Sequence, residues 1–218
     1  MARINPQRRA EIGRLKRHRT NGRIVDAALR VIADKGLDHF SIDDVVTEAG
    51  ISRGSFYNYY PDRGALITDM ADRFHDMLGE MPFQVDEDAG MRENLVAYLR
   101  CQNRFLRKAH EKPDWGRLIN EVFASERAER PFMGTHDPEI FFSFMTRLGE
   151  SGFIAYRSVD AIYDFFIGSM YFTMARIVEG SERPVASLIS DFFFHLLLAF
   201  GFTREDTERM IEEIMSAD

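Results

Sequence analysis

The sequence contains a single cysteine, Cys101, in 218 residues, and it therefore cannot form an internal disulfide framework. One thiol is compatible with a reducing cytoplasm, where disulfides are rare. The longest apolar stretch, residues 192–200, is interrupted by His195 and is far too short to span a bilayer. No apolar run follows the basic N-terminus, so the sequence gives no sign of a signal peptide. We therefore expect a soluble cytoplasmic protein with no membrane partner.

The spacings of the common catalytic and metal sites are also missing. The six histidines are scattered, and none stands in an HExxH or other metal-ligand spacing. No G-x-S-x-G, P-loop or G-x-G-x-x-G sequence is present. Cys101 is expected to be an inert half-buried residue rather than a nucleophile. His136, Asp137 and Glu139 could hold a cation, but helix capping explains Asp137 more simply. We therefore expect no catalysis, no metal and no cofactor.

The net charge of −7 hides an asymmetry between the two parts of the chain. Residues 1–63 hold 12 Lys and Arg against 8 Asp and Glu, a net charge of +4, which leaves −11 for the remainder. Such a division indicates an N-terminal part that faces nucleic acid on an acidic body.

Residues 1–20 carry seven basic residues and one acid, Glu11. A basic arm of this kind can follow phosphates or enter a minor groove. It can equally be a disordered, solubilising tail, and the residues alone do not choose between these interpretations. We assign residues 1–19 to this arm.

Hydrophobic periodicity and capping residues predict an all-α chain without strands or repeats. Thr20 is a suitable cap for the first helix, and Ser158 for a long helix near the C-terminus. Pro82 ends a helix, and residues 82–90 form a linker. The expected helices cover residues 20–35, 42–49, 53–60, 63–81, 91–110, 114–128, 138–150, 159–179 and 184–201, with a last one starting at residue 203.

Residues 41–66 have the spacing of a helix-turn-helix. Ser41 and Asp44 are three residues apart, as in a capping box. Gly50 suits a left-handed helix end, Ser52 is a good cap for a second short helix, and Pro61 stops it. In a helix-turn-helix the second helix is held out for insertion into a groove of DNA.

The second helix has residues suited to that role. Phe56 and Tyr60, four apart, can face the core, which leaves the other side chains to point elsewhere. Arg53 could address a guanine edge, and Gly54 allows the backbone close to the bases. The same spacing also fits a solvated helical hairpin whose tyrosines merely pack, so spacing alone leaves both interpretations open.

Residues 49–66, AGISRGSFYNYYPDRGAL, resemble the DNA-binding signature of the tetracycline-repressor (TetR) family of bacterial transcription regulators. The family pattern runs A-G-V-S-x-G-[ST]-[apolar]-Y-x-[YH]-F-x-[SND]-K-x-x-L. Ile51, Tyr60 and Arg63 replace its Val, Phe and Lys with similar chemistry. The match is dense, and with the preceding helix it covers roughly residues 20–80; beyond that, the similarity is one of architecture.

The resemblance implies an N-terminal three-helix DNA-binding domain over residues 20–64 and a C-terminal helical bundle over 65–218 for effector binding and dimerisation. Base contacts are implied for Arg53, Gly54, Ser55 and Tyr57, and phosphate contacts for Ser41, Ser52, Asn58, Tyr59 and Arg63. Asp43 departs from the basic or polar residue that some members use there, and it would repel phosphates if it faced them.

In the family, the C-terminal bundle encloses a small-molecule pocket and the last long helices form a four-helix dimer interface. Aromatic and polar groups in the bundle suit an apolar or aromatic effector. The candidates are Asn103, Phe105, Trp115, Asn120, Phe123, Phe141 and Phe144, with Trp115 the first choice. The two helices over 159–179 and 184–201 are apolar nearly all round, which indicates burial on two sides. The interface candidates are Phe166, Met170, Phe193, Leu197 and Phe200.

These observations predict a homodimeric, ligand-responsive repressor that binds a palindromic DNA operator and is released by its effector. An activator, or a helical ligand-binding protein without DNA recognition, is the alternative. An enzyme is a third class, which the missing motifs disfavour.

Overall fold

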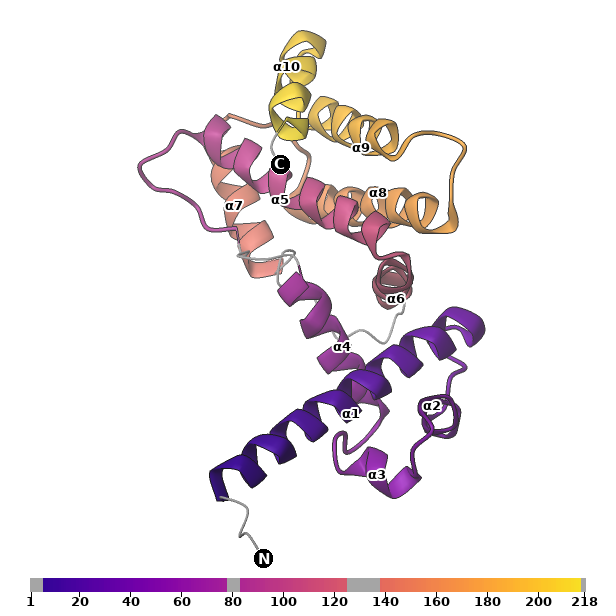
Figure 1. Cartoon of the computed structure of the whole chain (residues 1–218). Coiled ribbons are helices and arrows are strands. Elements are labelled where there is room, and N and C mark those ends of the chain that lie inside the picture. Colours follow the sequence, from indigo (N-terminus) through magenta and orange to yellow (C-terminus); the bar gives the residue numbers. More distant parts are fainter. Residues whose placement is uncertain (1–5, 78–82, 125–137, 217–218) are drawn as a thin grey trace, which may run out of the picture. The chain divides into compact units, whose positions relative to one another are not determined.

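The computed structural model describes residues 6–77, 83–124 and 138–216, and these form ten helices and no strand (Figure 1). The all-α prediction is confirmed for this part of the chain. No helix within it has both the length and the apolarity needed to cross a bilayer.

The first helix, α1, spans Pro6–Lys35, so the expected start at Thr20 is wrong. Residues 7–19 are rich in Arg, Lys, Gln, Glu, Ala and Leu, all good helix formers, and Pro6 fits the first helical position. Thr20 therefore lies inside a continuous helix rather than at its cap. The part of the predicted basic arm that the structure describes is helical.

The next three helices are α2 (Ile42–Ala49), α3 (Arg53–Tyr57) and α4 (Arg63–Met77). The Ser41 hydroxyl accepts the Asp44 backbone N–H at 3.2 Å, and the Asp44 carboxylate accepts the Ser41 backbone N–H at 3.0 Å, which confirms the capping box. Hydrogen bonds from Lys35 and Ser41 lower the pKa of Asp44 to about 2. Gly50 ends α2 at φ 61°, the left-handed conformation that favours glycine.

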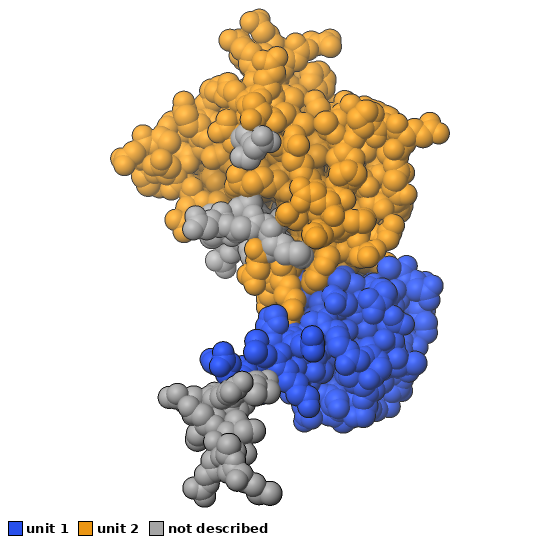
Figure 2. All heavy atoms as spheres, in the orientation of Figure 1, with its two compact units in different colours: residues 1–71 blue, residues 72–218 orange. Residues whose placement is uncertain are grey.

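The chain divides into two compact units, residues 1–71 and 72–218, which Figure 2 colours separately. The core of the first unit contains Ile24, Ala28 and Ile32 of α1, Val45 and Val46 of α2, Phe56 of α3, and Leu66 and Met70 of α4. Helix α4 begins in the first unit and ends in the second.

The second unit contains α5 (Met91–Glu111), α6 (Pro113–Ala124), α7 (Pro138–Glu150), α8 (Val159–Glu179), α9 (Val185–Ala199) and α10 (Arg204–Met215). Helix α8 contacts α5, α6, α7 and α9, while α10 contacts α5 and α9. Arg92 of α5 forms a bidentate ion pair with Glu213 of α10, at 2.9 and 2.6 Å. The bundle is thus built around α8, with α10 fixed to α5.

Candidate nucleic-acid interface

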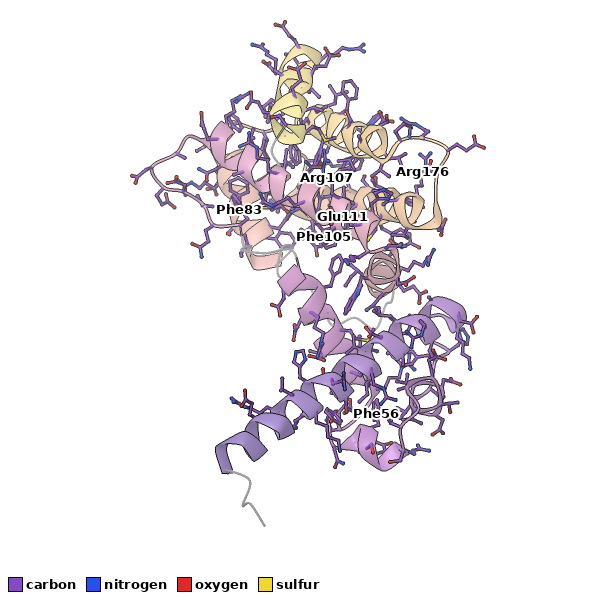
Figure 3. The ribbon with its side chains drawn as sticks, in the orientation of Figure 1. Phe56, Phe83, Phe105, Arg107, Glu111 and Arg176 are labelled. Carbon is purple, nitrogen blue, oxygen red and sulfur yellow. The ribbon has the colours of Figure 1, made fainter. Side chains whose placement is uncertain are left out.

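Helix α3 has one buried and one exposed side. Phe56 is 0% exposed and packs against Tyr57 and Tyr60, with ring centroids 5.6 and 5.7 Å apart (Figure 3). The Tyr60 hydroxyl accepts from the Asn21 amide of α1 at 2.7 Å and donates to Asp69 of α4. The predicted inward positions of Phe56 and Tyr60 are therefore confirmed.

Helix α3 is shorter than expected, because it ends at Tyr57 rather than at residue 60. The backbone N–H groups of Tyr59 and Tyr60 both turn back to the Phe56 carbonyl, at 2.8 and 3.1 Å. Pro61 keeps the residue before it out of the α conformation, so the helix cannot continue to its position.

The exposed side of α3 presents Arg53, Gly54, Tyr57 and Asn58, while Ser55 and Tyr59 are half-buried. These six residues were all predicted to meet DNA. Tyr57 is 45% exposed, although large aromatic side chains are usually well buried. The helix therefore offers a guanidinium, a phenol and an amide to solvent on one short surface.

Arg53 and Asp43 form an ion pair between α3 and α2, with 3.1 Å between Nη1 and the carboxylate. Hydrogen bonding with Tyr57 and the charge of Asp43 raise the pKa of Arg53 above its ordinary value. Asp43, whose charge seemed unfavourable beside phosphates, is thus opposed by a cation.

Three residues predicted to meet phosphates have roles within the domain. Ser41 caps α2, and Ser52 caps α3 by accepting the Ser55 N–H at 3.1 Å. Arg63 donates to the Leu37 carbonyl, and its guanidinium lies 4.2 Å from the centre of the Phe40 ring. Arg63 therefore fixes the start of α4 to the turn after α1.

Two residues of the predicted basic arm, Lys16 and Arg17, lie beside α3, and the sequence did not indicate which residues they would meet there. The Arg17 guanidinium is 5.7 Å from the centre of the Tyr59 ring. Lys16, Arg17 and Thr20 line a groove with Ser55, Asn58 and Tyr59. A helical periodicity continued through residues 6–20 would have indicated this face of α1.

In the second unit the predicted effector residues form two groups. Phe105 and Trp115 both pack on Phe74 of α4, with centroids 5.6 and 6.5 Å from its ring. Figure 3 labels Phe105. Phe141 and Phe144 surround Tyr98 instead, at 6.3 and 5.8 Å. The sequence showed that these residues share a domain but not which of them meet.

The polar candidates differ in their hydrogen bonding. The Asn103 amide donates to the Ile214 carbonyl at 3.0 Å and accepts from Arg107 at 3.1 Å, so it holds α10. The side-chain amide oxygen of Asn120, Oδ1, is buried without a hydrogen-bond partner among the described residues. The Tyr98 hydroxyl, which the sequence did not indicate, is likewise buried without a described partner, and burial raises its pKa. The Phe123 side chain lies outside the described residues.

The residues predicted for the dimer interface are all in the core of the single chain. Phe166, Met170, Phe193, Leu197 and Phe200 are at most 1% exposed, so a partner could touch almost nothing of them. Helix α8 packs against α5, α6 and α7, and α9 packs against α5 and α10. These five side chains therefore belong to the core of the single chain, and their place in a dimer interface stays a prediction. The apolar side chains left exposed here are Phe165 (42%), Phe172 (69%) and Leu198 (39%).

A groove of about 550 Å³ separates α8 from α9 on that exposed side. Phe165 and Phe172 lie along α8, seven residues apart, and therefore on one face. Arg176, Arg183 and Asp191 add charge around the groove, and His195 adds a polar ring (Figure 3 marks Arg176). Arg183 pairs with Asp191 at 2.5 Å. Among the described residues, no group of three or more His, Cys, Asp or Glu side chains is placed to hold a metal ion.

Residues 24–70 match the family model described as bacterial regulatory proteins, tetR family. An uncharacterized HTH-type transcriptional regulator of Bacillus subtilis (strain 168), YvdT, is 46% identical over 50 residues, which are 23% of this chain and 26% of that protein. The HTH-type transcriptional repressor LfrR of Mycolicibacterium smegmatis is 32% identical over 74 residues, 34% of this chain and 38% of that protein. The matches thus span well under half the length of these curated relatives.

Solved structures share the fold over most of the chain. RolR in complex with the ligand resorcinol superposes with a TM-score of 0.54 and 19% identity, covering 90% of this chain and 95% of RolR. The helix-turn-helix is therefore similar in sequence, and the second unit in fold.

Replacing Phe56 with alanine should destabilise the domain far more than replacing Tyr57 with alanine. Phe56→Ala removes a fully buried ring and is expected to lower the local free energy of unfolding of α1–α3 by about 3–5 kcal/mol. Tyr57→Ala removes an exposed ring and should change it by no more than about 0.5 kcal/mol. Amide hydrogen exchange of residues 24–60 measures both. Equal losses of protection would contradict the two-sided α3.

Proposed function

We infer that this chain regulates transcription by binding DNA, because it belongs to the TetR family of bacterial regulatory proteins by the sequence of its DNA-binding domain and by its fold. The observation that carries the inference is the exposed side of α3, where Arg53 and Tyr57 project from a helix anchored by Phe56. A recognition helix needs this combination of a buried anchor and exposed donors.

Arg53 is the residue we assign to base recognition, together with Gly54, Ser55 and Tyr57. A guanidinium can donate two hydrogen bonds to the O6 and N7 atoms of guanine in the major groove. Its ion pair with Asp43, at 3.1 Å, favours one orientation of the guanidinium in the free protein. Asn58 and Tyr59 follow on α3 and are assigned to the phosphates.

We assign the exposed face of α8 and α9 to a homodimer. Phe165 and Phe172 of α8 and Leu198 of α9 are large apolar side chains that a second copy would remove from water. A two-fold dimer presents two recognition helices to successive major grooves, about 34 Å apart, and therefore binds a palindromic operator.

The second unit is assigned to an effector that carries an aromatic or apolar group. The two aromatic groups around Phe74 and Tyr98 supply apolar surface. The Tyr98 hydroxyl and the side-chain amide oxygen of Asn120 supply buried hydrogen-bonding atoms without described partners. An unsatisfied buried polar atom is costly, so a ligand that pairs with it gains affinity. The complex of RolR with resorcinol is a precedent among proteins of this fold.

We propose repression as the output, as in the similar repressor LfrR. Effector binding would shift α4, the helix that begins in the first unit and ends in the second, and so change the spacing of the two α3 helices. A coupling free energy of about 1–3 kcal/mol weakens DNA binding roughly 5- to 150-fold.

Selection from a random duplex library should enrich an inverted-repeat sequence. Arg53→Ala should lower affinity for it by about 1–3 kcal/mol and relax the preference at one base pair in each half-site. Arg204→Ala, which removes an exposed arginine of the second unit, is the matched control and should leave binding unchanged. Failure of the folded wild-type protein to enrich any sequence would refute DNA-dependent regulation.

The wild-type protein should sediment at twice its 25.2 kDa mass, and Phe172→Glu should sediment as a monomer. The substitution places a carboxylate where two apolar faces meet. Because Phe172 is 69% exposed, the change should not unfold the isolated subunit. Leu15→Glu changes a similarly exposed leucine of α1 and should remain dimeric. A dimeric Phe172→Glu protein would assign the interface elsewhere.

Resorcinol and related small phenols are the first effector probes. Calorimetric titration should find a phenol whose affinity falls at least about tenfold in Tyr98→Phe, which corresponds to a lost hydrogen bond of about 1.4 kcal/mol. The same variant should be no less stable, because the hydroxyl has no described partner in the free protein. Unchanged affinity of every bound phenol would exclude Tyr98 as the anchor.

A further inference from the structure

The groove between the first half of α1 and α3 has a volume of about 330 Å³. Two cations, Lys16 and Arg17, line it from α1. Four side chains that can donate hydrogen bonds, Thr20, Ser55, Asn58 and Tyr59, complete the lining, together with Gly13 and no carboxylate. Such a composition favours an anion with several oxygen acceptors.

Contacts with α3 orient the cationic side of this groove. The Arg17 guanidinium lies 5.7 Å from the centre of the Tyr59 ring, within the range of a cation–π interaction. Tyr59 is itself half-buried. This contact holds Arg17 at the groove, which it lines beside Lys16.

The helix that supplies these cations has an excess of like charge. Residues 6–19 contain Arg8, Arg9, Arg14, Lys16, Arg17 and Arg19 against Glu11 alone. Like charges on neighbouring turns of a helix repel one another, and a polyanion would relieve that repulsion. This segment lies before residue 24, where the match to the family model begins.

We propose that this α1–α3 groove binds a phosphate of the DNA backbone beside the bases that α3 reads. The proposal rests on the DNA binding inferred above and adds the N-terminal half of α1 to the interface. A duplex phosphate is favoured over a free anion because Ser55, Asn58 and Tyr59 belong to the same short segment as Arg53 and Tyr57. A DNA strand that meets one side of this segment passes close to the other.

The slope of log affinity against log salt concentration tests the proposal. Each phosphate contact contributes roughly 0.9 to that slope, because binding releases the counterions condensed there. Lys16→Gln with Arg17→Gln is expected to reduce the slope by about 1, the value for one phosphate, and to weaken specific and random duplexes alike. Both residues are exposed, so the fold should persist.

Two matched controls separate the groove from the general charge of α1. Arg14→Gln removes one charge from the same helix outside the groove and should change the slope less than Arg17→Gln does. Gly13→Glu places a carboxylate at the groove, while Gly13→Ala makes the same backbone change without charge. A Cβ at Gly13 meets no atom within 4 Å, so both variants should fold. Only Gly13→Glu should weaken binding.

The outcomes distinguish this proposal from the proposed function. Wild-type binding with an unchanged slope in the double variant would refute the groove alone. An Arg14→Gln effect as large as that of Arg17→Gln would reduce it to general attraction and refute it too. Competition by inorganic phosphate at millimolar concentration, with no loss on duplex DNA in the variants, would assign the groove to a free anion. A wild-type protein that binds neither duplex would overturn both proposals.

Discussion

The burial of Phe56 is the constraint on which the exposed surface of α3 depends. A helix of five residues is too short to be stable by itself, because helix nucleation is unfavourable and few hydrogen bonds repay it. Phe56 is fully buried, and Tyr60 connects the same segment to Asn21 of α1 and Asp69 of α4. With these two side chains directed inward, Arg53 and Tyr57 are left outward on the other side of α3.

The second unit is organised around α8, the helix that contacts four others. This helix is apolar nearly all round, and contacts with four other helices bury the side that carries Phe166, Met170 and Met174. The polar groups within the bundle are of two kinds. The Asn103 and Arg100 side chains donate hydrogen bonds to backbone carbonyls of α10. Tyr98 and Asn120 each have a buried side-chain oxygen without a described partner. The first kind holds the bundle together, and the second is the pair that we propose for effector binding.

The sequence by itself determined most of the helices and the character of the first unit. Local signals act over three or four residues, and they are legible without tertiary contacts: the Ser41–Asp44 capping box, the left-handed Gly50 and the Ser158 cap all appear at the expected positions. The inward Phe56 and Tyr60 followed from their spacing. The start of α1 did not, since a capping residue such as Thr20 predicts a helix start only where the preceding residues disfavour helix, and here they do not.

Only the tertiary structure decided which faces are covered and which side chains meet. The sequence of a helix that is apolar all round does not indicate which face is buried. Packing alone therefore buried Phe166 and Met170 and left Phe165 and Phe172 exposed. Spacing likewise could not divide the aromatic residues into groups around Phe74 and Tyr98, nor place Arg17 beside Tyr59. These are contacts between residues far apart in the chain, and their geometry depends on how whole helices pack rather than on any local preference.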